Sequence, residues 1–176
     1  MTGRVIVING GSSSGKSTII RALQDVLSDP WLTFGVDDFV DALPPRLTSG
    51  DGGIDIAADG TVGVGAVFME QENLWMQGIG AMVRVGAKII IDDVFLGGPH
   101  SQGRWRAALE GIDVLWVGIR CDPDVAEARE KGRGDRPVGM ARQQAELVHR
   151  GVAYDLEVDS SVLTPAAAAE VIRARV

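Results

Sequence analysis

A short run near the N-terminus has the residue types and spacing of a loop that binds phosphate. Gly10 is followed by four residues and then by Gly15, Lys16 and Ser17, which fits the pattern Gly, any four residues, Gly-Lys-Ser/Thr. Glycine and small residues let backbone amides turn inward around phosphate oxygens. In this pattern the lysine reaches the β- and γ-phosphates of a nucleotide and the last hydroxyl binds Mg²⁺. The predicted phosphate-binding residues are Gly10, Gly11, Ser12, Ser13, Ser14, Gly15, Lys16 and Ser17.

The residues on either side predict a strand before this loop and a helix after it. Residues 4–9 form an apolar, β-branched run, and Ile19, Ile20 and Leu23 repeat at helical spacing. A helix that starts in the loop aims its unpaired amides and positive dipole end at an anion. The alternative, a Gly/Ser-rich turn that binds nothing, is disfavoured by this combination of strand, spacing and helix.

Two pairs of acidic residues follow other predicted strands. Asp37 and Asp38 end the run 31–36, and Asp92 and Asp93 end the β-branched run 88–91. In parallel α/β sheets, ligands bind outside the carboxyl ends of the strands, so both pairs are expected near the loop. Because successive strand residues point to opposite faces, one acid of each pair is expected to face the site.

Phosphoryl transfer to a hydroxyl needs a group that accepts the hydroxyl proton. Asp37 is the predicted catalytic base, and Asp38 could replace it, hold water around Mg²⁺ or cap a helix at Phe39. Asp92 is the predicted acid at Mg²⁺, together with Ser17, and Asp93 is its competitor. Spacing alone leaves both alternatives open.

The segment 132–137 (Gly-Arg-Gly-Asp-Arg-Pro) predicts a lid between two helices. The transition state spreads negative charge over the moving phosphoryl group, so it needs cations. Arg133 and Arg136 are therefore predicted catalytic residues beside Lys16 and Asp37, and the alternative is an exposed loop that pairs with nearby acids. Arg129 either points the same way or lies on the helix exterior.

The stretch 31–83 indicates what kind of acceptor would fit. Arg46 is its only Lys or Arg, and it contains no His. Acceptors that carry a phosphate or carboxylate need Arg clamps, so the acceptor is expected to be neutral and partly apolar, or cationic. The candidate pocket residues, each of which would also suit a core, are Phe39, Val40, Leu43, Phe68, Met69 and Trp75.

Composition excludes several classes of protein. A net charge of -7 argues against a nucleic-acid binder. The single cysteine, Cys121, excludes an intramolecular disulfide, and the absence of His/Cys clusters argues against a transition-metal site. His100 and His149 are interpreted as a loop residue and a helix-surface residue. No signal peptide or membrane-spanning stretch is predicted, so the expected location is the cytoplasm, with no membrane partner. The missing Asn-Lys-x-Asp motif favours ATP over GTP.

Apolar strands alternate with amphipathic helices, which predicts an α/β fold with a parallel sheet covered on both faces. The five expected strands are 4–9, 31–36, 88–91, 114–119 and 154–159, the last at an edge, in one domain spanning 1–176. Residues 39–66 depart from the alternation. They are interpreted as an insertion on the substrate side, with a possible hairpin formed by Ile54–Ile56 and Val62–Val64, or as a flexible loop.

Several longer runs carry a resemblance to a known family. The chain resembles the chloramphenicol 3-O-phosphotransferases, relatives of shikimate and adenylate kinases, over nearly its whole length. The matching runs are 9–17, 30–31, 34–37, 89–98, 113–118, 134–136 and 154–155. The runs 34–37 (Phe-Gly-Val-Asp) and 91–98 (Ile-Asp-Asp-Val-Phe-Leu-Gly-Gly) are far more specific than the phosphate loop. Segment 39–67 and the C-terminal helix resemble the family least.

The resemblance implies ATP-dependent phosphorylation of the primary hydroxyl of chloramphenicol, with Asp37 at the position of the base. Mg²⁺ is the cofactor expected from Ser17 and Asp92. The resemblance also implies a sheet with strand order 2-3-1-4-5 and an oligomer, which the residues themselves neither support nor exclude. Two alternatives remain: a kinase for another neutral or cationic hydroxyl compound, such as a sugar nucleotide or an aminoglycoside, and an ATP-binding regulatory protein without an acceptor.

Overall fold

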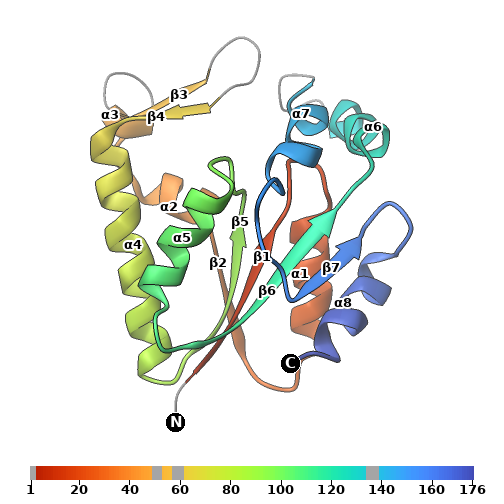
Figure 1. Ribbon diagram of the computed structural model, residues 1–176, viewed down its shortest axis with the longest axis horizontal. Helices are drawn as coiled ribbons and strands as arrows, with labels where there is room; N and C mark the ends of the chain where they lie inside the picture. Colours follow the sequence, from red (N-terminus) through yellow and green to blue (C-terminus); the bar gives the residue numbers. More distant parts are fainter. Residues whose placement is uncertain (1–2, 49–52, 57–61, 134–138) are drawn as a thin grey trace.

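The fold is an α/β sandwich around a five-stranded parallel sheet (Figure 1). The structure is a computed structural model that describes residues 3–48, 53–56, 62–133 and 139–176. The sheet has the order β2-β5-β1-β6-β7. Counted along the chain without the small hairpin, this is the predicted order 2-3-1-4-5. Its strands are β1 (Arg4–Asn9), β2 (Trp31–Gly35), β5 (Lys88–Asp93), β6 (Asp113–Arg120) and β7 (Leu156–Asp159).

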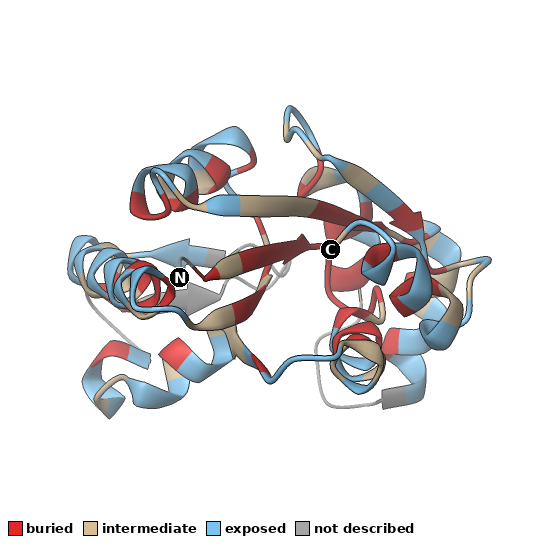
Figure 2. Ribbon diagram, turned by 90° about the horizontal axis from the view of Figure 1, so that it is seen from below, coloured by how far each residue is buried: buried red, intermediate tan, exposed pale blue. Residues whose placement is uncertain are grey.

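Helices cover both faces of the sheet because its strands are apolar on both sides. On β1, Ile6 and Ile8 join the core under α1 (Lys16–Val26) and α8 (Pro165–Arg173). Val5 and Val7, which alternate with them, join the core under α4 (Ala66–Arg84) and α5 (Pro99–Ala108). Figure 2 shows these central strands as the buried layer between the helices.

The remaining elements surround the carboxyl ends of the strands, at the top of Figure 1. They are α2 (Val36–Ala42), α3 (Pro45–Thr48), α6 (Pro123–Arg133), α7 (Met140–Leu147) and the antiparallel hairpin of β3 (Ile54–Ile56) and β4 (Val62–Val64). The predicted hairpin is therefore confirmed, and its turn lies outside the described residues. Segment 39–66 continues helix α2 and adds α3, so its described part is not a structureless loop.

Several predicted strand ends are wrong by one or two residues, since β5 continues to Asp93 and β6 spans Asp113–Arg120. The second strand ends at Gly35 because Val36 begins α2, where the Asp38 carboxylate accepts a hydrogen bond from the Gly35 amide at 2.7 Å. This capping interaction favours a helix directly after the strand. The last strand begins at Leu156 and not at Tyr154. The Tyr154 hydroxyl accepts a hydrogen bond from the side chain of Asn9, at the end of β1.

Among the described residues, we find no helix that combines the length and the apolar character needed to span a membrane.

Candidate functional site

The phosphate loop leaves β1 at Asn9 and enters α1 at Lys16. Ser13 and Gly15 adopt left-handed backbone angles, with φ of 57° and 85°. Within the described chain, the backbone amides of Ser13, Gly15, Lys16 and Ser17 have no hydrogen-bond partner, whereas the Ser14 amide is bonded to the Gly11 carbonyl. Four unpaired amides at a helix N-terminus form a ready site for an anion such as a phosphate group.

Lys16 and Asp92 meet beside this loop. The buried Lys16 ammonium donates to the Gly10 carbonyl at 2.7 Å and lies 3.6 Å from an Asp92 oxygen. The other Asp92 oxygen accepts from the Ser17 hydroxyl at 3.4 Å. Burial raises the pKa of Asp92, the Lys16 charge opposes this, and the negative charge of Asp37 adds to the rise. The strand-end acid of β5, the phosphate loop and α2 thus share one electrostatic site.

Asp93 points to the other side of β5. Its buried carboxylate accepts hydrogen bonds from the Trp105 indole at 2.5 Å and from the Val94 amide at 2.6 Å. Burial raises its pKa to about 6. Asp93 therefore anchors α5 to the end of β5, and Asp92 is the acid of this pair that faces the loop, as strand alternation requires.

Asp37 and Asp38 differ in what their side chains do. Both lie in the first turn of α2 and both are exposed. Asp38 is engaged as the cap of its own helix, through the Gly35 amide. Asp37 is the acid of this pair whose charge affects Asp92.

The residues at this end of the sheet suit a magnesium ion. Ser17 and Asp92 offer hard oxygen donors next to the four free amides. Mg²⁺ is held by one or two protein oxygens together with phosphate oxygens and waters, so it needs no larger cluster. The described residues contain no group of three or more His, Cys, Asp or Glu side chains that could hold a metal.

Arg129 of α6 reaches the phosphate loop, which was one of its two predicted positions. Its guanidinium donates to the Ser14 carbonyl at 3.4 Å and to the Ser160 carbonyl at 2.8 Å. Beside it lies a pocket of about 340 Å³. The pocket is lined by Ser13, Gly15, Thr18, Ile19, Arg129, Ser160, Leu163 and Pro165. Arg136 and the Arg133 side chain lie outside the described residues, although α6 itself extends to Arg133.

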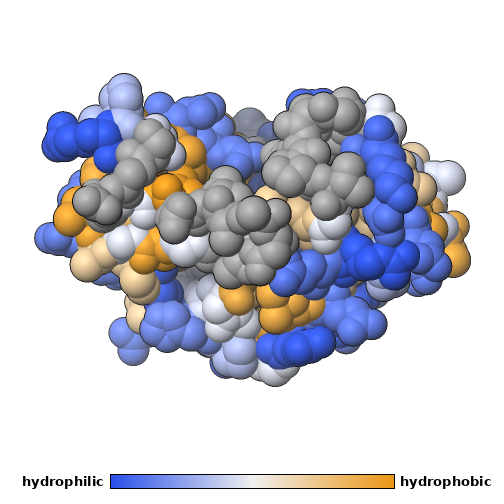
Figure 3. All heavy atoms as spheres, turned by 90° about the horizontal axis from the view of Figure 1, so that it is seen from above, coloured by the Kyte–Doolittle hydropathy of each residue, from blue (hydrophilic) through white to orange (hydrophobic). Residues whose placement is uncertain are grey.

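A second pocket of about 430 Å³, lined mostly by apolar residues, lies where α2, α3 and α4 meet. Figure 3 looks onto the strand ends and shows apolar atoms gathered on this side of the molecule. Of the six predicted pocket residues, Phe39, Leu43 and Trp75 line it. Phe68 is buried edge-on against Phe39, with ring centroids 5.1 Å apart. The full lining is Phe39, Ala42, Leu43, Pro44, Arg46, Leu47, Val67, Gln71, Leu74 and Trp75.

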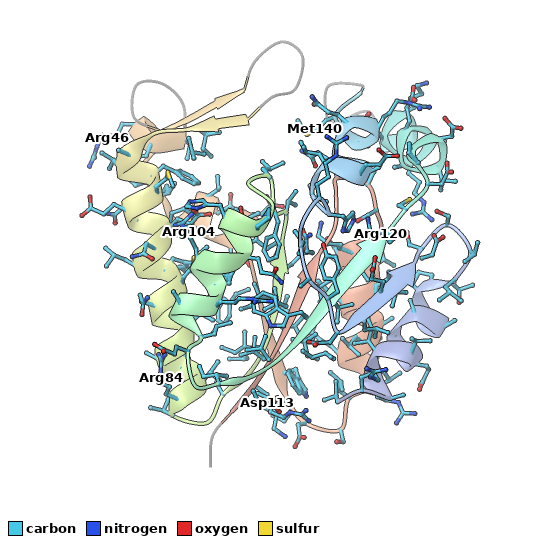
Figure 4. All side chains as sticks on the ribbon, in the orientation of Figure 1. Arg46, Arg84, Arg104, Asp113, Arg120 and Met140 are labelled. Atoms are coloured by element: carbon cyan, nitrogen blue, oxygen red, sulfur yellow. The ribbon has the colours of Figure 1, made fainter. Side chains whose placement is uncertain are left out.

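Arg104 is a cation near the predicted acceptor region that lies outside the stretch 31–83, so the sequence analysis did not include it. This residue of α5 forms an ion pair with Glu72 of α4 and donates to the Met69 carbonyl at 3.2 Å (Figure 4). No local pattern indicates this contact, because α5 begins 16 residues after the end of that stretch, beyond strand β5. Glu72 balances the Arg104 charge, so the arginine is not free to clamp an anionic acceptor.

The interpretation of His149 as a helix-surface residue is wrong. His149 lies just past the end of α7 and is 4% exposed. The side-chain amide of Asn9 donates to the Tyr154 hydroxyl at 2.5 Å. This hydroxyl therefore donates its own proton to His149 Nδ1 at 2.7 Å. That arrangement suits a neutral imidazole, and burial lowers the pKa of His149 to about 4. Sequence reasoning also missed Asn9, whose side chain additionally bonds the Val148 carbonyl and the Phe95 amide.

Burial of His149 predicts a specific pH dependence of stability. Its pKa falls from 6.5 to about 4 on folding, so the unfolded chain binds the proton first as the pH drops. This histidine therefore lowers the free energy of unfolding between about pH 6.5 and pH 4, by about 2 kcal/mol at pH 5. Asp93 acts oppositely, because its raised pKa favours the folded state on acidification.

Urea unfolding of the wild type and of His149→Gln at pH 7 and pH 5 isolates the histidine contribution. The variant should lose less stability than the wild type on acidification, and the exposed His100→Gln should behave as the wild type. Equal losses in all three proteins would contradict a buried neutral His149.

Comparisons with known proteins show which family the chain belongs to. A family model described as chloramphenicol phosphotransferase-like protein matches residues 3–176. A protein of Mycobacterium tuberculosis strain H37Rv, named as a candidate O-phosphotransferase, is 31% identical over 173 residues, which cover 90% of this chain and 76% of the relative. Its counterpart in strain CDC 1551 matches equally well.

Solved structures with this fold include the tunicamycin resistance protein of Deinococcus radiodurans, with a TM-score of 0.67, 20% identity, and coverage of 98% of this chain and 95% of that one. Shikimate kinase of Aquifex aeolicus has a TM-score of 0.63 and 17% identity, with coverage of 97% and 94%. At these identities the likeness concerns the fold. The family match over nearly the whole chain decides the assignment: the chain belongs to the chloramphenicol phosphotransferase-like family and is a phosphotransferase.

Proposed function

We propose that the protein transfers the γ-phosphoryl group of ATP to a hydroxyl of a neutral, partly apolar small molecule, with the primary hydroxyl of chloramphenicol as the leading acceptor. The observation that carries the proposal is the convergence of Lys16, Ser17, Asp92 and Asp37 around four unpaired loop amides. A nucleotide-binding protein without an acceptor needs the loop, but it does not need an exposed acid on α2 that lies near enough to raise the pKa of Asp92.

Each residue has a distinct part in this reaction. The loop amides and Lys16 hold the β- and γ-phosphate oxygens and oppose their charge. Ser17 and Asp92 would bind Mg²⁺, which neutralises charge on the triphosphate. Asp37 accepts the hydroxyl proton while the oxygen attacks phosphorus and the bond to ADP breaks. Arg133 and Arg136 remain proposed to steady the moving phosphoryl group.

Each of the two pockets is proposed to bind one of the two substrates. The one beside Arg129 adjoins the phosphate loop and is proposed to take the nucleoside. The apolar one shares helix α2 with Asp37 and is proposed to take the acceptor. Its walls are aliphatic and aromatic apart from Gln71 and Arg46, which favours a neutral acceptor with an apolar body.

Trp75 gives a test of the acceptor pocket. Its ring lies 5.9 Å from those of Phe34 and Phe39 and lines the pocket. Trp75→Ala should raise the KM for the acceptor by roughly 5- to 150-fold, because a lost aromatic contact costs about 1–3 kcal/mol. The KM for ATP should stay unchanged. Steady-state kinetics with each substrate varied in turn checks this, and Trp116→Ala on β6 removes a tryptophan from outside the pocket as a control.

Acceptors of different charge test the substrate class. The exposed acids Asp37, Asp38 and Asp41 on α2 keep a cationic acceptor, such as an aminoglycoside, as the second candidate. We expect ADP release to be stimulated by chloramphenicol and not by shikimate, an anionic alcohol. Stimulation by an aminoglycoside alone would replace the neutral acceptor by a cationic one, and stimulation by shikimate would contradict the pocket assignment.

A further inference from the structure

Helix α7 touches the phosphate loop at two points on either side of Gly10. The Gln144 side-chain oxygen accepts a hydrogen bond from the Ser12 amide at 2.8 Å. One turn later, the Val148 carbonyl accepts from the Asn9 side chain at 2.8 Å. Gln144 is 6% exposed and Val148 is fully buried, so water cannot replace either contact without opening the helix from the loop.

The loop also packs directly on this helix. A Cβ atom at Gly11 would lie 3.0 Å from the Gln144 backbone carbon and 3.0 Å from its Cβ. Such an approach is tighter than ordinary van der Waals contact and is possible only because residue 11 has no side chain. The backbone of the loop is therefore fitted to the position of Gln144.

The neighbouring helix α6 holds α7 in place. Both oxygens of Glu130 are used, one by the Gly139 amide at 2.7 Å and the other by the Ala141 amide at 2.8 Å. Glu130 is 2% exposed, and these amides are among those that a helix start leaves unpaired. Below this contact, Ala141 packs with Cys121 and Ala126 in a small apolar cluster. Figure 4 shows Met140 at the start of α7, next to α6.

The bond from Ser12 has a consequence for phosphate binding. It fixes the Ser12 amide on Gln144, outside the group of amides at Ser13, Gly15, Lys16 and Ser17 that have no partner in the described chain. A loop whose amides already have their binding orientation before the anion arrives loses less conformational entropy on binding. Without the Gln144 oxygen, the Ser12 amide would lose the acceptor that fixes its present orientation, and the loop would shift.

We propose that Gln144 is a positioning residue that holds the phosphate loop in its binding conformation through the Ser12 amide, with Glu130 fixing the helix that carries it. Gln144 does not need to touch the nucleotide. It acts on the affinity for the triphosphate and not on the acceptor pocket, whose residues come from α2, α3 and α4. The inference rests on the proposed use of ATP.

The test is isothermal titration of the whole protein with ATP and Mg²⁺, for the wild type and two variants. Gln144→Met keeps the length of the side chain and removes the acceptor oxygen. We expect it to bind ATP roughly 10- to 100-fold more weakly, as for a buried amide left without its partner. The neighbouring Gln143 is exposed on the same helix, so Gln143→Met should bind as the wild type does. The KM for the acceptor should stay the same in all three proteins.

The outcomes separate the two proposals. If the wild type does not bind ATP, the proposed function fails before the role of Gln144 is reached. If the wild type binds ATP and a folded Gln144→Met binds it equally well, Gln144 only supports the fold and the inference is wrong. Thermal unfolding of each variant shows whether it is folded at the temperature of the titration. Should Gln144→Met not fold, Glu130→Gln, which keeps one acceptor oxygen, replaces it, and an unchanged ATP affinity in that variant would overturn the inference.

Discussion

Replacing Asp37 with Asn should leave ATP binding intact and lower the rate of phosphoryl transfer by about 10²- to 10⁴-fold, the usual contribution of a positioned general base. Asn has nearly the same shape but cannot accept the hydroxyl proton. It also removes the negative charge that helps to raise the pKa of Asp92, so nucleotide and metal binding should not weaken. The measurement is the turnover rate at saturating substrates, with ATP affinity determined separately.

Asp38 provides the matched control, since it lies next to Asp37 in the same helical turn. Asp38→Asn keeps a side-chain oxygen that can accept from the Gly35 amide, so it should preserve the cap and most of the activity. A protein with Asn at position 37 that works as fast as the wild type would remove Asp37 from the reaction. Loss of activity in the Asp38 variant alone would assign the base to Asp38.

The second large effect is expected at Lys16. Lys16→Ala should weaken ATP binding and slow transfer together, each by roughly 10- to 100-fold, because charge-assisted hydrogen bonds to phosphate are lost. The substitution should also raise the pKa of Asp92, because the Lys16 charge is the largest of the influences that lower it. Without this charge the partly buried Asp92 carboxyl holds its proton more strongly and binds Mg²⁺ less well.

Lys88→Ala is the control for the loss of a positive charge. Lys88 begins strand β5, whereas Asp92 lies near its end, and its ammonium pairs with Asp29 away from the loop. Its replacement should change neither ATP affinity nor transfer. An unchanged nucleotide affinity in Lys16→Ala, measured by titration calorimetry, would contradict the phosphate-loop assignment.

Local patterns predicted the sheet well because its strands are short, apolar and bounded by turn residues. The run 88–91 is enough to predict a strand, and the phosphate loop after residues 4–9 is enough to predict the helix that follows it. The order of the strands in the sheet was predicted from the family resemblance. The apolar pattern did not predict the ends of the strands as well. It would continue the second strand to Val36, but a hydrogen bond from the Gly35 amide to the Asp38 carboxylate favours a helix that begins there.

The parts of the site that escaped prediction depend on contacts between distant residues. Arg104 meets Glu72 across two helices, and Gln144 meets Ser12 across 132 residues. His149 looks like a surface residue in a helical pattern because nothing local reveals that Tyr154 and Asn9 enclose it. Strand alternation predicts that one of Asp92 and Asp93 faces the loop. Which one does so is shown only by contacts with distant residues: Asp93 accepts from the Trp105 indole, and Asp92 contacts Ser17.

The most direct test of the account is ADP release from Mg²⁺-ATP with and without chloramphenicol, together with the mass of the product. The account predicts strong stimulation by chloramphenicol and a product that carries one added phosphate on its primary hydroxyl. ATP binding without any stimulation would contradict chloramphenicol as the acceptor. ATP hydrolysis at an equal rate with every alcohol offered, and no phosphorylated product, would contradict phosphoryl transfer itself.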